Sequence, residues 1–140
     1  MSSSFNKYNC FVENLAEKVH NLASDTLKVA LTNTAPNAAT HAVLADIGEI
    51  AGGNGYTAGG NQTAQSSSSQ TGGTYTLVSA DPATWTASGG SIGPFRYAVL
   101  YNATAAGGPL IGYWDYGASI TLNVGETFTV DLGASTLTLT

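Results

Sequence analysis

The sequence comprises 140 residues and has a mass of 14.2 kDa, the size of one domain with a modest core. Hydrophobic residues make up 43%, a usual share for a globular protein, so we expect the chain to fold. Charged residues make up only 9%, against about 25% in ordinary soluble domains. A surface of uncharged polar side chains causes little repulsion between copies, which favours a protein that assembles.

The few basic residues argue against a nucleic-acid interface. The net charge is −5, and the basic residues are scattered: Lys7, Lys18, Lys28 and Arg96. A nucleic-acid binder needs several cations along one track to displace counterions. No segment approaches the ~20 consecutive apolar residues of a transmembrane helix. We therefore expect neither nucleic acid nor a membrane as a partner.

The cysteine content and the first residues bear on the compartment. Cys10 is the only cysteine, so an intrachain disulfide is impossible. Its place in an apolar helical pattern indicates a small packed side chain rather than a reactive thiol. The start, MSSSFNKYNC, lacks the basic region and apolar run of a cleaved secretory signal. We expect a protein made in the cytoplasm, or one that leaves by another route.

Residues 9–22, NCFVENLAEKVHNL, form the one good helix candidate. Apolar side chains recur there at helical spacing and would line one face of the helix. This stripe consists of Phe11, Val12, Leu15, Val19 and Leu22. The spacing therefore predicts an amphipathic helix over 9–22.

The pattern after this helix is that of β-strands and loops. In TLKVALTN, Leu27, Val29 and Leu31 recur at every second position, as in a half-buried strand. Residues 52–73 contain mainly Gly, Ser, Thr, Asn and Gln, and Tyr56 is their only large side chain. We predict a flexible loop over 52–73. Part of it could instead be an edge strand on an assembled surface.

Residues 74–140 contain several short strand candidates separated by turns. They are TYTLVSA, TWTAS, PFRYAVLYN, LIGYWDYG, SITLNVGETFTVDL and STLTLT. Strict alternation in PFRYAVLYN puts Phe95, Tyr97, Val99 and Tyr101 on one face. Together with the helix, these strands predict a mainly β (α+β) fold, an antiparallel β-sandwich or barrel with one N-terminal α-helix. We expect one domain over 1–140.

The stretch IAGGNGYTAGGN resembles a phosphate-binding loop in its spacing. Gly53, Gly55 and Ala58 fit the G-x-G-x-x-G/A pattern of dinucleotide-binding loops. Such a loop must leave a buried strand and enter a helix whose N-terminus faces the phosphate. The residues that follow, GGNQTAQSSSSQTGG, carry no apolar helical stripe. We therefore predict an ordinary loop here and no cofactor.

No set of residues in the sequence suggests catalysis or a metal site. His20 and His41 are the only histidines, and neither lies in a His-x-x-x-His or Cys-x-x-Cys motif. Asp46 and Glu49 could share an ion, but two carboxylates are few for calcium. Burial among aromatic side chains could raise the pKa of Asp115 and make it a general acid, although a hydrogen-bonded structural carboxylate fits better. We predict no catalytic, cofactor-binding or metal-binding residues, and no enzyme.

The aromatic stretch YWDY offers a glycan-binding alternative. Tyr113, Trp114 and Tyr116 could form a platform on which a sugar stacks, with Asp115 binding its hydroxyl groups. On a strand, however, Tyr113 and Asp115 face one side, and Trp114 and Tyr116 face the other. At least one of these sides would belong to the core, which weakens the alternative.

Three stretches resemble small virion structural proteins of tailed bacteriophages. They are FNKYNCFVENLAEKVHNLASDTLKVALTNTAP, EIAGGNGYTAGG, and FRYAVLYNATAAGGPLIGYWDYG followed by GETFTVDL. The resemblance covers most of the chain except residues 62–73, and it is most like a capsid decoration, or cement, protein. It concerns the overall sequence and carries no set of functional residues.

The resemblance implies a β-rich domain, commonly a homotrimer, on the outside of the assembled head. There it would bind the major capsid protein and bridge neighbouring capsomers. We expect the N-terminal helix and the open Gly-rich loop, residues 61–72 above all, to contact the shell or a neighbouring subunit. Its expected location is therefore the capsid surface of the virion. A phage tail or adaptor component and a glycan-binding module on the virion surface remain as alternatives.

Overall fold

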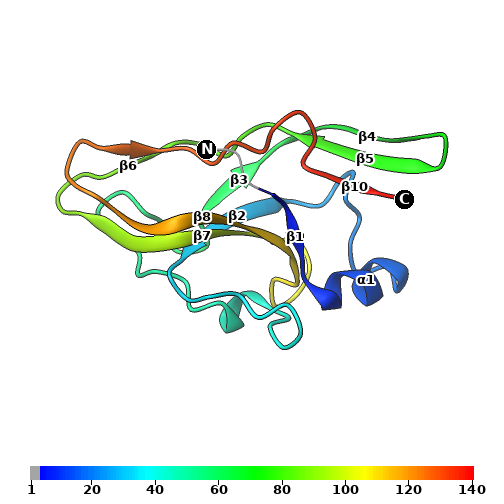
Figure 1. Ribbon diagram of the computed structural model, residues 1–140, viewed down its shortest axis with the longest axis horizontal. Coiled ribbons are helices and arrows are strands. Elements are labelled where there is room, and N and C mark those ends of the chain that lie inside the picture. Colours follow the sequence, from blue (N-terminus) through cyan, green and yellow to red (C-terminus); the bar gives the residue numbers. More distant parts are fainter. Residues whose placement is uncertain (1–3) are drawn as a thin grey trace.

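The computed structural model describes residues 4–140 and confirms a mainly β fold with antiparallel sheets (Figure 1). Within this range the only α-helix is α1 (Asn9–Ala16), and η1 (Leu44–Asp46) is a short 3₁₀ helix. No helix among these residues is both long and apolar enough to span a bilayer. The fold is therefore decided by how the strands pair and pack.

The largest sheet has five strands in the order β1-β8-β7-β2-β3, with antiparallel neighbours. Their bounds are β1 Asn6–Lys7, β2 Leu27–Thr32, β3 Asn61–Thr63, β7 Ile92–Asn102 and β8 Leu110–Leu122. The strand expected in TLKVALTN is β2, and its Leu27, Val29 and Leu31 are buried. Ala30 and Thr32 on the other face are buried too, so the prediction that the strand is only half-buried is wrong. Both edges of β7 are paired, so this strand forms the centre of the molecule.

Two smaller sheets complete the fold. One has three strands in the order β10-β5-β4, and in the other β6 pairs with β9. Their bounds are β4 Gln65–Thr71, β5 Thr74–Ser79, β6 Trp85–Thr86, β9 Thr127–Phe128 and β10 Leu137–Leu139. In Figure 1 the β4–β5 hairpin extends at one end of the molecule above α1, and β6 lies at the opposite end.

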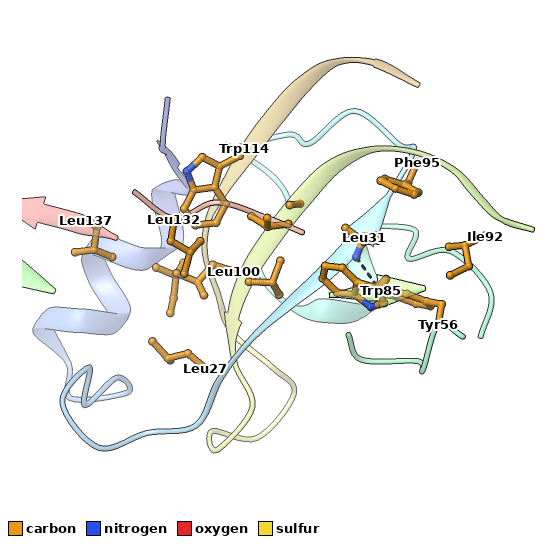
Figure 2. Packing of buried hydrophobic residues seen from close by; sticks show 14 of the residues in the cluster. Leu27, Leu31, Tyr56, Trp85, Ile92, Phe95, Leu100, Trp114, Leu132 and Leu137 are labelled. Atoms are coloured by element: carbon orange, nitrogen blue, oxygen red, sulfur yellow. Dashed lines mark hydrogen bonds between the residues drawn. The ribbon is translucent and has the colours of Figure 1, made fainter. Parts of the chain in front are cut away.

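The main hydrophobic core joins all three sheets. Leu31 and Leu100 contribute from the five-stranded sheet, Leu137 from the three-stranded sheet and Trp85 from the two-stranded sheet (Figure 2). A second, smaller cluster consists of Tyr8, Ala30, Ile47, Val99, Tyr101 and Leu110. Because neighbouring residues of β2 and β7 belong to different clusters, the centre of the large sheet is buried on both faces.

An irregularity in β7 corrects the face that alternation predicts. The register between β7 and β8 shifts between Phe95 and Tyr97. Such a shift moves the following side chains to the opposite face of the sheet. Phe95 therefore lies in the main core, whereas Val99 and Tyr101 lie in the second cluster. The prediction that these three share a face is wrong.

Helix α1 ends at Ala16, so the prediction of a helix over 9–22 is wrong beyond that residue. Lys18 has a φ of 69°, in the left-handed region, and the N–H of Val19 donates to the carbonyl of Asn14 at 2.8 Å. This is the hydrogen-bond pattern of a Schellman motif, which terminates a helix. Val12, expected in the apolar stripe, is 53% exposed.

The loop expected over 52–73 contains two strands, β3 and β4, so this prediction is wrong for much of its length. β4 lies at the edge of the three-stranded sheet, as the alternative of an edge strand anticipated. Its hairpin turns through Gly72 and Gly73, which have φ values of 58° and 87°. Two successive positive φ angles are those of a type I′ turn, the geometry that suits a two-residue hairpin.

Candidate functional site

The glycine loop is a tight turn without the frame of a phosphate site. Gly53 and Tyr56 exchange two backbone hydrogen bonds, of 2.7 and 3.0 Å. The chain then turns again and enters β3 rather than a helix. An anion would therefore meet no helix N-terminus, and the interpretation of Gly53, Gly55 and Ala58 as an ordinary loop is confirmed.

His20 belongs to a buried hydrogen-bond network in the turn after α1. Its Nδ1 lies 3.1 Å from Nδ2 of Asn102, and this amide group also donates to Asp25 at 2.6 Å. An amide nitrogen can only donate, so Nδ1 accepts and the ring proton resides on Nε2. The side chain is 5% exposed, and its burial lowers the pKa of His20.

His41 lies in a different place and has a local role. Its Nδ1 accepts a hydrogen bond from the N–H of Asn37 at 3.2 Å. Asp46, at η1, accepts from the N–H groups of Ala42 and Val43, and these bonds lower the pKa of its carboxyl. Among residues 4–140, no three His, Cys, Asp or Glu side chains come together to hold a metal ion.

Glu49, the other carboxylate considered for an ion, forms a hydrogen bond to a buried tyrosine. The Tyr56 hydroxyl donates to Oε2 of Glu49 at 2.5 Å. It also accepts from the N–H of Leu31 at 3.0 Å, a bond that Figure 2 shows. The N–H of Gly59 donates to the same carboxylate oxygen at 2.6 Å. Burial and the bond to Glu49 raise the pKa of Tyr56, so its hydroxyl keeps its proton. These three hydrogen bonds, called the Glu49 cluster below, connect residues 49–59 to β2.

Cys10 has the environment of a packed thiol. Its sulfur lies 3.7 Å from the carbonyl oxygens of Ala42 and Leu110. Burial raises the pKa of the Cys10 thiol, whereas a reactive cysteine needs a lowered pKa.

Asp115 is a structural carboxylate in an ion pair. Its two oxygens accept from Nε and Nη2 of Arg96 at 2.8 and 3.1 Å, and the N–H of Gly117 donates to it at 2.8 Å. The bond with Arg96 holds the pKa of Asp115 below its usual value. The suggestion of a raised pKa is therefore wrong, and the structural interpretation is confirmed.

The aromatic side chains of β8 do not form one platform. Trp114 is 3% exposed and packs in the main core against Phe5, at a ring-centroid distance of 5.4 Å. Tyr113 packs against Tyr8 on the side of the second cluster. Only Tyr116 is exposed. A sugar could not stack on Tyr113, Trp114 and Tyr116 together.

A cavity of about 350 Å³ opens between the segment that follows α1 and the three-stranded sheet. Leu15, Leu22, Tyr75 and Leu139 give it a mainly apolar lining, and Lys18 is its only permanently charged residue. The hydroxyl groups of Ser68 and Tyr75 are 2.8 Å apart at its border. A partner that binds the inner face of the β4–β5 hairpin would therefore also contact this cavity.

The β4–β5 hairpin presents the most distinctive surface of the molecule. Residues 66–73 are all exposed, and β4 is an edge strand. Residues 50–80 carry no charged side chain. Natural edge strands are usually guarded by lysine, proline or a covering element. This surface thus has free backbone groups and no charge to repel a partner.

The sequence pointed to this segment as an open loop that could contact the shell or a neighbouring subunit, and it did not predict the hairpin. The available signals were the Gly72–Gly73 pair between two polar runs and the absence of charge over 50–80. No family model, curated protein or solved structure matches this chain. The functional proposal therefore rests on the exposed surface of the molecule and on the resemblance of its sequence to virion structural proteins.

Proposed function

We propose that this chain is a non-enzymatic structural subunit, a capsid decoration protein that binds the outside of a tailed-bacteriophage head. Its partner there would be the major capsid protein, and its role would be to stabilise contacts between capsomers. The phage setting rests on the resemblance of the sequence to virion structural proteins. What supports the structural role is the kind of surface that the chain presents.

The observation that carries the proposal is the exposed, uncharged β4–β5 hairpin. Its outer face presents the uncharged side chains of Ser67, Ser69, Thr76 and Val78, which can pack against a neighbouring protein and form hydrogen bonds with it. A coat protein of this kind contacts many neighbours, so modest individual contacts are multiplied into firm attachment. The low overall charge also lets many copies pack closely on one shell.

The direct test localises the chain in the virion of the phage that encodes it. We expect an image reconstruction of the particle to show the chain on the outer face of the head, in a fixed ratio to the major capsid protein. A few copies at one vertex would support a tail or adaptor component instead. Absence from the particle would refute both proposals.

Variants of the hairpin test whether this surface makes the contact. Ser67 and Ser69 share the outer face of the hairpin with Thr76 and Val78, their cross-strand partners. Replacing both serines by lysine should weaken binding to empty heads by at least about tenfold, because each added charge loses solvent on binding. The matched control replaces Ser88 and Ser91, which are exposed outside the hairpin, by lysine. Equal binding of both double variants would contradict the role of the hairpin.

A further inference from the structure

The outer edge of β4 has no partner strand among residues 4–140, because β4 ends the order β10-β5-β4. The hairpin has a two-residue turn, so Thr71 pairs with Thr74 and Ser69 with Thr76. Hydrogen-bonded pairs alternate with non-bonded pairs along such a ladder, beginning with the pair that flanks the turn. Ser67, Ser69 and Thr71 therefore bond toward β5. The backbone N–H and C=O groups of Ser68 and Gln70 point to the free edge.

β4 differs from the other strands that end a sheet. β3 and β10 have three residues each, and β1, β6 and β9 have two each; β1 also contains Lys7. Short length and lysine are common ways to prevent pairing at an edge. β4 has seven residues, it contains neither a charged residue nor proline, and its ladder is uninterrupted over Ser67–Thr71, beyond the register shift between Gln65 and Ser67. It is thus the strand edge most open to a further strand.

We infer that β4 pairs with β4 of a second copy of this chain, antiparallel, around a twofold axis at Ser68. An axis perpendicular to the sheet keeps each face of one copy on the same face of the next, so Ser68 meets Ser68 of the second copy. The register of β4 against β5 shifts between Gln65 and Ser67, so the regular contact between the copies is centred on Ser67, Ser68 and Ser69. The two three-stranded sheets become one continuous sheet of both copies.

The chemistry of the strand favours a second copy over a foreign strand. A twofold contact places each residue near the same residues of the other copy, so any charge would face a like charge and weaken the pair. β4 has none, and its serines are self-complementary because a hydroxyl both donates and accepts. Ser68 is the central residue of Gln65–Thr71, and it lies within the uninterrupted part of the ladder, Ser67–Thr71.

This inference deepens the proposed structural role, but it can be tested on the purified chain without any shell. The contact joins copies in pairs, so a threefold contact of the kind that the resemblance implies would use other surfaces. A purified chain that stays monomeric would contradict the pairing but not the binding to the head. A chain that dimerises but does not bind heads would contradict the proposed function but not the pairing.

The first experiment compares Ser68→Pro with Ser68→Ala by sedimentation equilibrium. Proline removes the outward N–H without removing a bond to β5, and edge strands tolerate it in this orientation. Both variants lose the hydroxyl that contacts Tyr75, so alanine is the matched control. We expect the wild type and Ser68→Ala to dimerise, and Ser68→Pro to do so at least about tenfold more weakly, because symmetry removes the donor from both copies.

Far-UV circular dichroism of all three proteins checks that the fold is kept, and a cross-link tests the register. In a Cys10→Ala background, Ser68→Cys should form a disulfide-linked dimer on mild oxidation. The Cα atoms of a hydrogen-bonded antiparallel pair lie about 5.5 Å apart, within disulfide range. Ser119→Cys, at an exposed position outside the hairpin, is the control and should link more slowly. A monomeric wild type, equal association of Ser68→Pro and Ser68→Ala, or equal cross-linking rates would overturn the inference.

Discussion

The β4–β5 hairpin and the rest of the strands are both antiparallel β-structure, yet their side chains are opposite in character. The rest, called the body below, comprises the five-stranded sheet and the β6–β9 pair, which share the main core. In β7, the residues from Ala98 to Asn102 are all buried, because one cluster covers each face. In β4, all residues after Gln65 are exposed, and one edge is unpaired. The body thus defines the fold by packing, and the hairpin displays backbone and hydroxyl groups.

Stability and interaction therefore reside in different parts of this chain. Burial of apolar area is the main source of folding free energy, so the body should carry most of it. The hairpin is held mainly by its ladder and by a few apolar side chains such as Leu77. Substitutions in the body should therefore change the free energy of unfolding, and substitutions in β4 should change association. The predictions below test this division.

Trp85→Ala should have the largest effect. Trp85 is 1% exposed, and its ring lies 6.2 Å from that of Tyr56 and 6.4 Å from that of Phe128, measured between centroids. Truncation leaves a large cavity, so we expect the free energy of unfolding to fall by about 3–5 kcal/mol. Urea denaturation followed by far-UV circular dichroism measures the loss.

Trp85→Phe is the matched control for this substitution. It keeps an aromatic ring in the core and removes an indole N–H that has no partner among residues 4–140. The loss should therefore be clearly smaller than for alanine. If Trp85→Ala cost no more than Ser69→Ala in the hairpin, the division between body and hairpin would be wrong.

Gly60→Ala and Gly72→Ala compare the same change in the two regions. Both glycines have positive φ, 74° and 58°, so both substitutions cost about 1–2 kcal/mol of backbone strain. At Gly60 the new methyl group would also overlap the carbonyl of Val29, whereas nothing lies within 4 Å at Gly72. We expect a total loss of about 2–5 kcal/mol at Gly60 and only the strain at Gly72, by urea denaturation. Equal losses would show that the structure around Gly60 rearranges to accept the methyl group, so that the body is packed no more tightly than the hairpin.

The elements that the sequence predicted well are those with a periodic buried face. Leu27, Val29 and Leu31 alternate, and β2 is where they predicted it. Periodicity failed where one residue changed the backbone locally. Lys18 ends α1 in the left-handed region usually occupied by glycine, and the irregularity after Phe95 reverses the faces of β7.

The candidate site was harder to predict because it contains no chemical signature. The side chains of β4 are polar on both faces, so no alternation marks the strand. The strand forms because it pairs with β5 across the Gly72–Gly73 turn, and this pairing does not show in the side chains of β4 itself. The residues that did suggest chemistry, such as Asp115 and Glu49, are occupied in structural hydrogen bonds.

Tyr56→Phe should have an intermediate effect, because it removes one buried hydroxyl from the body. The N–H of Leu31 and the carboxylate of Glu49 would both lose a partner. We expect a loss of about 1–3 kcal/mol in the free energy of unfolding. Tyr101→Phe, which removes a single bond to the carbonyl of Gly59, is the control and should cost about 0.5–1.5 kcal/mol. A larger loss for Tyr101→Phe would mean that the Glu49 cluster does not hold residues 49–59 to the body.

His20→Gln should have the smallest effect, which appears only as a change in pH dependence. His20 lines the cavity beneath the hairpin, where the two regions meet, and its pKa is lowered from 6.5 mainly by burial. The unfolded chain therefore binds the proton more readily than the folded chain. The stability due to neutral His20 is complete above about pH 6.5 and is lost as the pH falls from there through the folded-state pKa. Glutamine does not titrate, and it can still accept a hydrogen bond from Asn102.

Urea denaturation of the wild type between pH 7.5 and 5 should therefore show a steeper loss than that of His20→Gln. His41→Gln, which changes the histidine outside this network, is the matched control for the substitution itself. If the wild type and His20→Gln had the same slope, His20 would not be buried in its neutral form. Water would then enter the contact between the body and the hairpin. Leu22 and Leu77 lie in one core, which indicates that the two regions unfold together, and a hydrated contact would weaken that coupling.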